Sequence, residues 1–389
     1  MRAVEVLGVG TTAFGVHLES TLAQLAVEAG RAACRDAGVP MDEIEELYFA
    51  NAAGGVISGQ EMIRGQVATR GSALEGVPCF NVENACASGS TAFSLAWWSV
   101  ASGRSELAIV IGAEKLHHID KSVSFRAIES GTDLSWTSDV TGNGSVMMSA
   151  YASEAKRYSR QHGADLPAAL AAVAVKNRSF AVHNPAAQFR SSIDPADVAA
   201  SREVADPLRL LMCSPLTDGA AAVVLSAARP REGASGHGAE RVVVLASRAA
   251  SYSDAERVVA RAAWRALSDA GVGIDEIDVA QLHDACAFAE IQQYEDVGLA
   301  AVGRGASAVL SGDFGPDGRC PVNTDGGLLS RGHALGATGV AQIVELTTQL
   351  RGLAGPRQVA GAKVAFAMNS GGWMGEDYAA AVGTVLSTD

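Results

Sequence analysis

The chain carries an internal repeat, and this repeat limits the folds that the sequence can adopt. Residues 86–92 read CASGSTA and residues 333–339 read HALGATG, an offset of 247 positions (333 minus 86). Each segment begins with a reactive side chain, continues through small residues and enters an apolar helical pattern. A thiol and an imidazole at equivalent points of a duplicated fold could meet across its pseudo-twofold axis.

A second match supports the duplication. Residues 36–44 (DAGVPMDEI) recur as residues 269–277 (DAGVGIDEI), an offset of 233 (269 minus 36). In both copies Asp-Ala-Gly ends an amphipathic helix, because glycine readily takes the left-handed conformation that stops a helix, and a short apolar strand follows. We therefore predict two related halves, residues 1–240 and residues 241–389, joined by the Gly/Ser/Arg-rich stretch Pro230–Glu240.

Apolar runs alternate with helical patterns in both halves, which predicts an α/β protein. The runs are continuous rather than alternating, as is typical of strands covered on both faces by helices. The expected strands are residues 46–50, 107–112, 220–226, 241–246, 279–283 and 363–368. Residues 117–206 depart from this pattern, and we interpret them as loops and helices inserted in the first half, a common location for substrate specificity.

Composition excludes several classes of function. A net charge of −13, with no basic block, argues against nucleic acid as a partner. No apolar run approaches the roughly 20 residues of a membrane span. The six cysteines are scattered without metal-binding spacing. We therefore expect no metal and no membrane, and the reduced thiols favour a cytoplasmic protein.

Cys86 and His333 are the first candidates for catalysis. Cys86 precedes a helix, whose dipole favours a thiolate at its N-terminus. His333 lies among glycines that allow close approach to a ligand. From local context alone, Cys86 could instead be a core cysteine and His333 could brace a helix start.

His283 and the glycine pair at residues 371–372 are the next candidates. His283 follows an apolar strand, where an imidazole can donate a hydrogen bond to a developing oxyanion. Its alternative is a structural histidine held by Asp284. Adjacent glycines leave backbone N–H groups free for an oxyanion, although they also fit an ordinary tight turn.

Taken in order, these segments resemble the thiolase superfamily, and most closely its sterol-carrier-protein-type thiolases and thiolase-like acyltransferases. The resemblance spans nearly the whole chain and rests on residues 9–15 (VGTTAFG), 84–89 (NACASG), 112–115 (GAEK), 218–222 (DGAAA), 283–284 (HD), 323–327 (NTDGG) and 332–339 (GHALGATG). It implies a five-layered αβαβα thiolase fold from two related halves, with a loop domain inserted in the first half at about residues 117–206.

The resemblance also implies roles for individual residues. In the family, a cysteine matching Cys86 is acylated and a histidine matching His333 activates it. The histidine matching His283 helps to form one oxyanion hole. The N–H groups of Cys86 and of the glycine matching Gly371 form the other.

Three departures from the family pattern concern the second chemical step. Classical thiolases carry an acid/base cysteine where this chain has Asn369. Sterol-carrier-type thiolases place a cysteine directly after His-Asp, where this chain has Ala285, with Cys286 one position later. A one-residue slip turns a side chain to the opposite face, so Cys286 is a doubtful acid/base group. Asn369 is doubtful because an amide cannot take up and return a proton as a thiol can. The usual proline after the catalytic histidine is Ala334.

These features favour an acyltransferase or Claisen-type condensing enzyme that moves an acyl group from a coenzyme A or acyl-carrier thioester through an acyl-Cys86 intermediate. Coenzyme A thioester is then substrate, and we expect no permanently bound cofactor. The family implies a homodimer or a dimer of dimers.

Two alternatives stay open. Some thiolase-like proteins resemble retro-aldolases that use tyrosines and work with a small zinc-ribbon/OB-fold partner, and Tyr294 supports this hypothesis. The third hypothesis is a non-catalytic scaffold subunit, against which the presence of Cys86, His283 and His333 argues.

Overall fold

The computed structural model describes residues 1–135, 145–228 and 240–388, and in this part of the chain one nine-stranded sheet dominates. Its strand order is β3-β2-β4-β7-β1-β8-β11-β10-β9. The strands are β1 (Val4–Thr11), β2 (Glu46–Ala50), β3 (Cys79–Val82), β4 (Leu107–Glu114), β7 (Gly219–Ala227), β8 (Val242–Ser251), β9 (Val279–Gln281), β10 (Val364–Gly371) and β11 (Ala380–Thr388). All six strands expected from apolar runs are present.

The sheet is mirrored about its centre. β1 and β8, the first strands of the two halves, meet there in an antiparallel pairing of Glu5 with Val243. From this seam the order runs outward through β7, β4 and β2 on one side and through β11, β10 and β9 on the other. Each half contains antiparallel and parallel neighbours, so burial on both faces does not make the sheet purely parallel.

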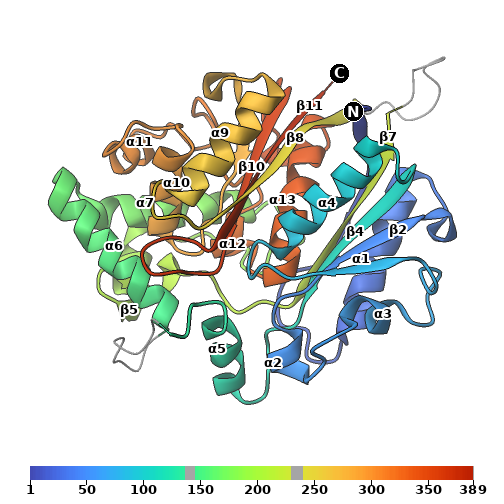
Figure 1. Ribbon diagram of the computed structural model, residues 1–389. Helices are drawn as coiled ribbons and strands as arrows, with labels where there is room; N and C mark the ends of the chain where they lie inside the picture. The colour runs from blue at the N-terminus through green and yellow to red at the C-terminus, as the bar shows by residue number, and fades with distance from the viewer. Residues whose placement is uncertain (136–144, 229–239, 389) are drawn as a thin grey trace.

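Helices complete five layers (Figure 1). α4 (Ser88–Ser102) and α13 (Leu335–Leu350) pack against each other in the central layer, between the two halves of the sheet. α1 (Leu22–Ala37) covers the outer face of the first half through β1, β7 and β4, and α9 (Val258–Ala270) covers that of the second through β8 and β11. This is the predicted αβαβα fold.

The repeated segments occupy matching places. α1 ends at Gly38 with φ 68°, and α9 ends at Gly271 with φ 67°. Only glycine adopts this left-handed conformation without steric cost, which explains why Asp-Ala-Gly recurs in both halves. Each helix is followed by a single 3₁₀ turn and then by the next strand, β2 or β9.

The remaining elements lie around this framework. The first half also contains α2 (Gly54–Ser58) and α3 (Arg64–Thr69), and the second contains α10 (Ala287–Asp296), α11 (Gly305–Leu310) and α12 (Gly327–Ser330). The predicted insertion contains α5 (Lys121–Glu129), α6 (Val146–His162), α7 (Leu166–Ala181), α8 (Pro195–Ala200) and the short hairpin β5 (Glu203–Ala205) and β6 (Leu208–Arg209). Residues 230–239 of the expected joint lie outside the described residues, and the boundary at residue 240 stays a prediction.

Local sequence explains where the insertion helices begin. The Ser145 side chain caps α6, and the Asp165 side chain caps α7, which has Pro167 in its first turn. Within the described ranges, none of the helices is long and apolar enough to cross a lipid bilayer.

Candidate active site

Cys86 and His333 stand in equivalent positions, each two residues before a helix of the central layer. Cys86 precedes α4, which starts at Ser88, and His333 precedes α13, which starts at Leu335. Ala85 adopts a left-handed φ of 48°, which turns the chain sharply before the thiol. The repeat therefore places a thiol and an imidazole at the starts of two neighbouring helices.

The structure brings Cys86, His283 and His333 together. The Cys86 sulfur and one ring nitrogen from each histidine all lie within 4.8 Å of one another. The two imidazole rings stand edge to face, with centroids 5.3 Å apart. Residues 247 positions apart in the sequence thus form one compact group, together with a histidine from the end of β9.

Thr338 fixes the orientation of His333. The Thr338 hydroxyl donates to the carbonyl oxygen of Ala334 and lies 2.8 Å from His333 Nδ1. Its oxygen therefore accepts the Nδ1–H, which leaves Nε2 as the unprotonated nitrogen. The backbone N–H of His333 also donates to the Thr217 hydroxyl. These contacts present His333 Nε2 as a base.

Asn369 places the proton of His283 on the other ring nitrogen, Nε2. Its amide Nδ2 lies 3.1 Å from His283 Nδ1, and its Oδ1 accepts a hydrogen bond from the Ser90 hydroxyl. Because the amide nitrogen donates to Nδ1, the proton of the neutral imidazole resides on Nε2. His283 is therefore oriented as a hydrogen-bond donor. Asp284 does not hold His283; it accepts from the backbone of α12 instead.

Gly371 lies directly against the backbone of Cys86. A Cβ at this position would approach the backbone nitrogens of Ala87 and Cys86 and the carbonyl oxygen of Asn84 too closely. Only glycine permits this contact. The neighbouring N–H of Gly372 and that of Cys86 itself both stabilise the thiolate by hydrogen bonding, so one member of the glycine pair supplies a donor at the sulfur.

The Cys86 thiol is nevertheless not ionised at rest. Burial, together with the nearby Glu114 carboxylate, raises the pKa of Cys86 to about 12, against the lowering effect of the two N–H groups. Desolvation therefore outweighs the stabilisation of the thiolate that the helix start and the backbone N–H groups provide. Burial also raises the pKa of Glu114 to about 7.

Both histidines are neutral as well. Burial, and then the Arg331 charge, lowers the pKa of His283 to about 3. Burial and the neighbouring His283 hold the pKa of His333 well below its ordinary value. The site at rest is therefore a neutral thiol between a neutral base and a neutral hydrogen-bond donor.

The three residues line a cavity of about 670 Å³. Apolar side chains of the insertion form much of its wall, among them Phe125, Met147 and Met148, and Arg126 and Arg202 add positive charge. The insertion thus contributes to the wall of the cavity, in keeping with the expected location of substrate specificity.

Two buried tyrosines in this cavity were missed by sequence reasoning. Tyr151 donates its hydroxyl hydrogen to Tyr378, at 3.1 Å, and the Tyr378 ring lies 5.9 Å from that of His283. Cys213 also lines the cavity. No local motif marks these residues, because they come from α6, from the loop after β10 and from the segment before β7.

Cys286 and Tyr294 lie elsewhere. Cys286 is fully buried before α10 and does not line the cavity, whereas its neighbour Ala285 does. This is the one-residue slip that the sequence indicated. Tyr294 is buried against Phe314 and donates to the Glu290 carboxylate, outside the cavity lining.

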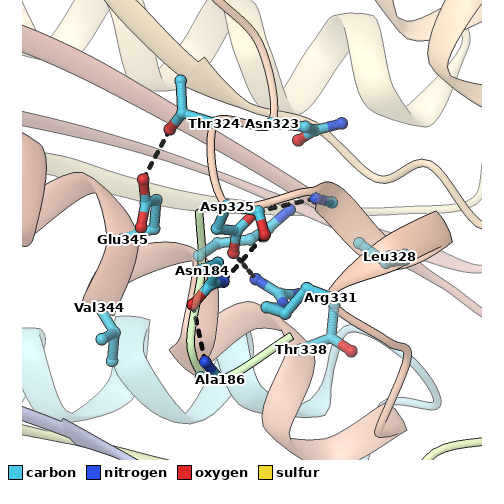
Figure 2. A network of polar contacts seen from close by, with 12 residues as sticks. Asn184, Ala186, Asn323, Thr324, Asp325, Leu328, Arg331, Thr338, Val344 and Glu345 are labelled. Carbon is cyan, nitrogen blue, oxygen red and sulfur yellow. Dashed lines mark hydrogen bonds and ion pairs between the residues drawn. The ribbon is translucent and has the colours of Figure 1, made fainter. Parts of the chain in front are cut away.

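A buried polar network supports the loop that carries His333 (Figure 2). The Asp325 carboxylate pairs with Arg331 at 2.5 Å, both nearly inaccessible to solvent, and the Asp325 carbonyl accepts from the Asn184 side chain. Thr324 donates to Glu345 on α13. The NTDGG motif therefore holds the loop against α13 and against the segment that follows α7.

Comparisons with known proteins match nearly the whole length of this chain. A family model described as "Thiolase, N-terminal domain" matches residues 4–229, and one described as "Thiolase C-terminal domain-like" matches residues 246–384. The chain is 38% identical over 381 residues to the acetyl-CoA acetyltransferase of Methanothermobacter thermautotrophicus, covering 96% of this chain and 97% of that protein. It is 32% identical to the benzoylsuccinyl-CoA thiolase subunit BbsB of Thauera aromatica, covering 90% and 89%.

Other matches extend the comparison. Sterol carrier protein 2 of Homo sapiens is 33% identical, over 95% of this chain and 70% of that protein. Among solved structures, an Ltp2-ChsH2(DUF35) aldolase superposes with a TM-score of 0.79 at 22% identity, covering 100% of this chain and 98% of that one. Human mitochondrial 3-ketoacyl-CoA thiolase gives 0.73 at 14% identity, covering 100% and 99%. At these identities the structural likeness concerns the fold.

Proposed function

This chain belongs to the thiolase superfamily and is a thiolase-type acyltransferase, and from this premise we propose that it transfers acyl groups from coenzyme A thioesters through a covalent intermediate on Cys86. The observation that carries the proposal is the close grouping of the Cys86 sulfur with His283 and His333. A nucleophile with an adjacent, oriented base is the arrangement that covalent acyl chemistry requires.

Acylation begins with proton transfer from the Cys86 thiol to His333 Nε2 as the sulfur attacks the thioester carbonyl. Because both groups are neutral at rest, proton transfer and attack are coupled. The N–H groups of Cys86 and of the Gly371–Gly372 pair stabilise the oxyanion. The departing coenzyme A thiolate then takes the proton from His333, which leaves acyl-Cys86.

His283 acts in the second half of the reaction. Its Nε2–H, fixed by Asn369, donates to the thioester oxygen of the acceptor as that oxygen gains negative charge. An acceptor that supplies its own carbanion attacks acyl-Cys86, so that the carbon–carbon bond forms as the carbon–sulfur bond breaks. The departing Cys86 thiolate then takes a proton from solvent, which regenerates the thiol. Phe125, Met147 and Met148 give the cavity an apolar wall suited to an acyl chain, which supports a role in lipid or related acyl metabolism.

Intact-mass measurement after incubation with acetyl-CoA tests the proposal. The unmodified protein should gain one acetyl group, Cys86→Ala none, and the control Cys213→Ser the same as the unmodified protein. His333→Ala should slow acylation by about 10²- to 10⁴-fold with little effect on binding. A fully active Cys86→Ala variant would sink the proposal and would favour the retro-aldolase hypothesis.

Cleavage by free coenzyme A should be weak. Asn369 occupies the position of the acid/base cysteine of classical thiolases and cannot take up and return a proton, while Cys286 lies outside the cavity lining. We expect measurable self-acylation but slow thiolysis of acetoacetyl-CoA. Asn369→Cys should regain part of the cleavage, although it loses the contact that orients His283. Rapid thiolysis by the unmodified enzyme would contradict this interpretation.

The proposal also covers the oligomeric state of the chain and a candidate partner protein. We infer a cytoplasmic homodimer or dimer of dimers, in keeping with the family resemblance, and a small zinc-ribbon/OB-fold partner is a further candidate. Acylation assays with and without such a partner would show whether it is needed.

A further inference from the structure

The grouping of Cys86, His283 and His333 also has the donor atoms of a metal site. A thiolate and two imidazoles form a donor set that binds Zn²⁺, which takes cysteine and histidine ligands in a tetrahedral arrangement. Sequence spacing does not reveal this set, because its members come from three segments far apart in the chain. The sequence-based expectation of no metal was drawn from local spacing alone.

The geometry fits a three-ligand site with one open position. Tetrahedral bonds of about 2.0–2.3 Å require donor atoms about 3.5 Å apart, and the three donor atoms lie within 4.8 Å of one another. A contraction of about 1 Å, within reach of small side-chain rotations, completes the site. Because all three residues line the 670 Å³ cavity, water from the cavity can fill the fourth position.

Supporting hydrogen bonds are also in place. Ligating histidines are usually held by a hydrogen bond at their other ring nitrogen. Thr338 provides this bond at Nδ1 of His333, and Asn369 lies at Nδ1 of His283. Burial keeps both imidazoles neutral, as ligands must be.

We propose that Cys86, His283 and His333 bind one Zn²⁺ ion and that this ion reversibly blocks acyl transfer. Binding forms one Zn–S bond and two Zn–N bonds and releases the Cys86 proton to solvent, with no change in oxidation state. The sulfur can then no longer attack a thioester. Acylation of Cys86 and zinc binding therefore exclude each other.

One local rearrangement accompanies binding. Coordination through His283 Nε2 requires the ring proton to move to Nδ1, where Asn369 now donates. A half-turn of the Asn369 amide lets Oδ1 accept this proton and Nδ2 donate to the Ser90 oxygen. The Ser90 hydroxyl then gives its single hydrogen to the carbonyl of Ala87 alone, so Asn369 and Ser90 both keep hydrogen-bond partners.

Metal binding is measured directly, without an activity assay. Zn²⁺ is titrated against a chromophoric chelator, and Co²⁺ serves as a spectroscopic probe because a tetrahedral cobalt–thiolate bond absorbs characteristically. The unmodified chain should bind one ion with this absorption, and Cys86→Ser should lose it. Thr338→Val should weaken binding by about 10- to 100-fold, because it removes only the supporting hydrogen bond.

Cys213→Ser is the matched control, since Cys213 lines the same cavity but lies outside the three-residue group. It should bind as the unmodified chain does. The proposal is overturned if no ion competes with the chelator, if Cys86→Ser binds equally well, or if Cys213→Ser alone removes the cobalt–thiolate absorption. Because the readout is binding, failure of the acyl-transfer proposal leaves this result interpretable.

Discussion

The chemical role of each histidine in this site depends on which side chain contacts its Nδ1 atom. His283 and His333 carry the same imidazole, yet Asn369 makes one a donor and Thr338 makes the other a base. The sequence identified both histidines and Cys86 as candidates. It could not assign their protonation, because residues 283 and 369 meet only through the parallel pairing of β9 and β10.

The reactivity of the Cys86 thiol should depend steeply on pH. Because the pKa of Cys86 is raised to about 12, the thiolate fraction should increase about tenfold per pH unit from pH 7 to 10. Iodoacetamide labelling of the Cys86 peptide, quantified by mass spectrometry, should follow this slope, with Cys86→Ser as the background. A plateau near pH 7 would instead show a resting thiolate–imidazolium pair.

The buried Asp325–Arg331 pair offers a second test at the residue scale. Asp325→Ala leaves the Arg331 guanidinium buried without a counter-charge and should cost about 3–5 kcal/mol of unfolding free energy. Asp313→Ala, which breaks a solvent-exposed pair with Arg319, should cost at most about 1 kcal/mol. Urea denaturation measures both. Equal effects would show that burial does not decide the cost.

At the scale of elements, the repeat and the apolar runs predicted much of the framework. The sequence indicated a short apolar strand before Cys86 but not its bounds, and it did not reveal β11. The strand is β3, which is only four residues long and has Phe80 and Asn81 exposed, so it lacks a buried-strand pattern. β11 contains Gly383, whose position against α9 leaves little room for a side chain. Pairing with neighbours, rather than intrinsic preference, makes these segments strands.

The crossing of α4 and α13 should tolerate no added atom at Gly339. A Cβ there would meet the backbone of Ser90 and lie 2.9 Å from Asn369 Oδ1. Gly339→Ala should therefore cost about 1–3 kcal/mol through overpacking, more than the roughly 0.5–1 kcal/mol that alanine gains in a helix. It should also slow acylation. Thr348→Ala on the same helix is the control, and an active Gly339→Ala of unchanged stability would disprove the close crossing.

At the scale of the whole molecule, the sheet edge formed by β3 exposes apolar side chains. β3 is a terminal strand, with Phe80 37% exposed, and nearby Met62, Ile63 and Val67 are 76%, 58% and 39% exposed. An unpaired strand edge beside apolar side chains favours association with another copy. The homodimer inferred from the family resemblance fits this edge.

Sedimentation should therefore detect a dimer at micromolar concentration. Val67→Asp places a charge in the apolar group and should shift the protein toward monomer, whereas Val302→Asp, at an exposed position beside α11, should not. A stable, active monomer of 39.9 kDa for the unmodified chain would contradict this prediction.

The equivalent placement of Cys86 and His333 bears on how such a site can arise. An assembly of two identical half-length chains would present the same side chain at both helix starts, either two thiols or two imidazoles. Neither symmetric pair is a nucleophile beside its base. Joining the halves in one polypeptide lets the two positions differ. The presence of a nucleophile at one helix start and a base at the other therefore depends on gene fusion as much as on the folded geometry.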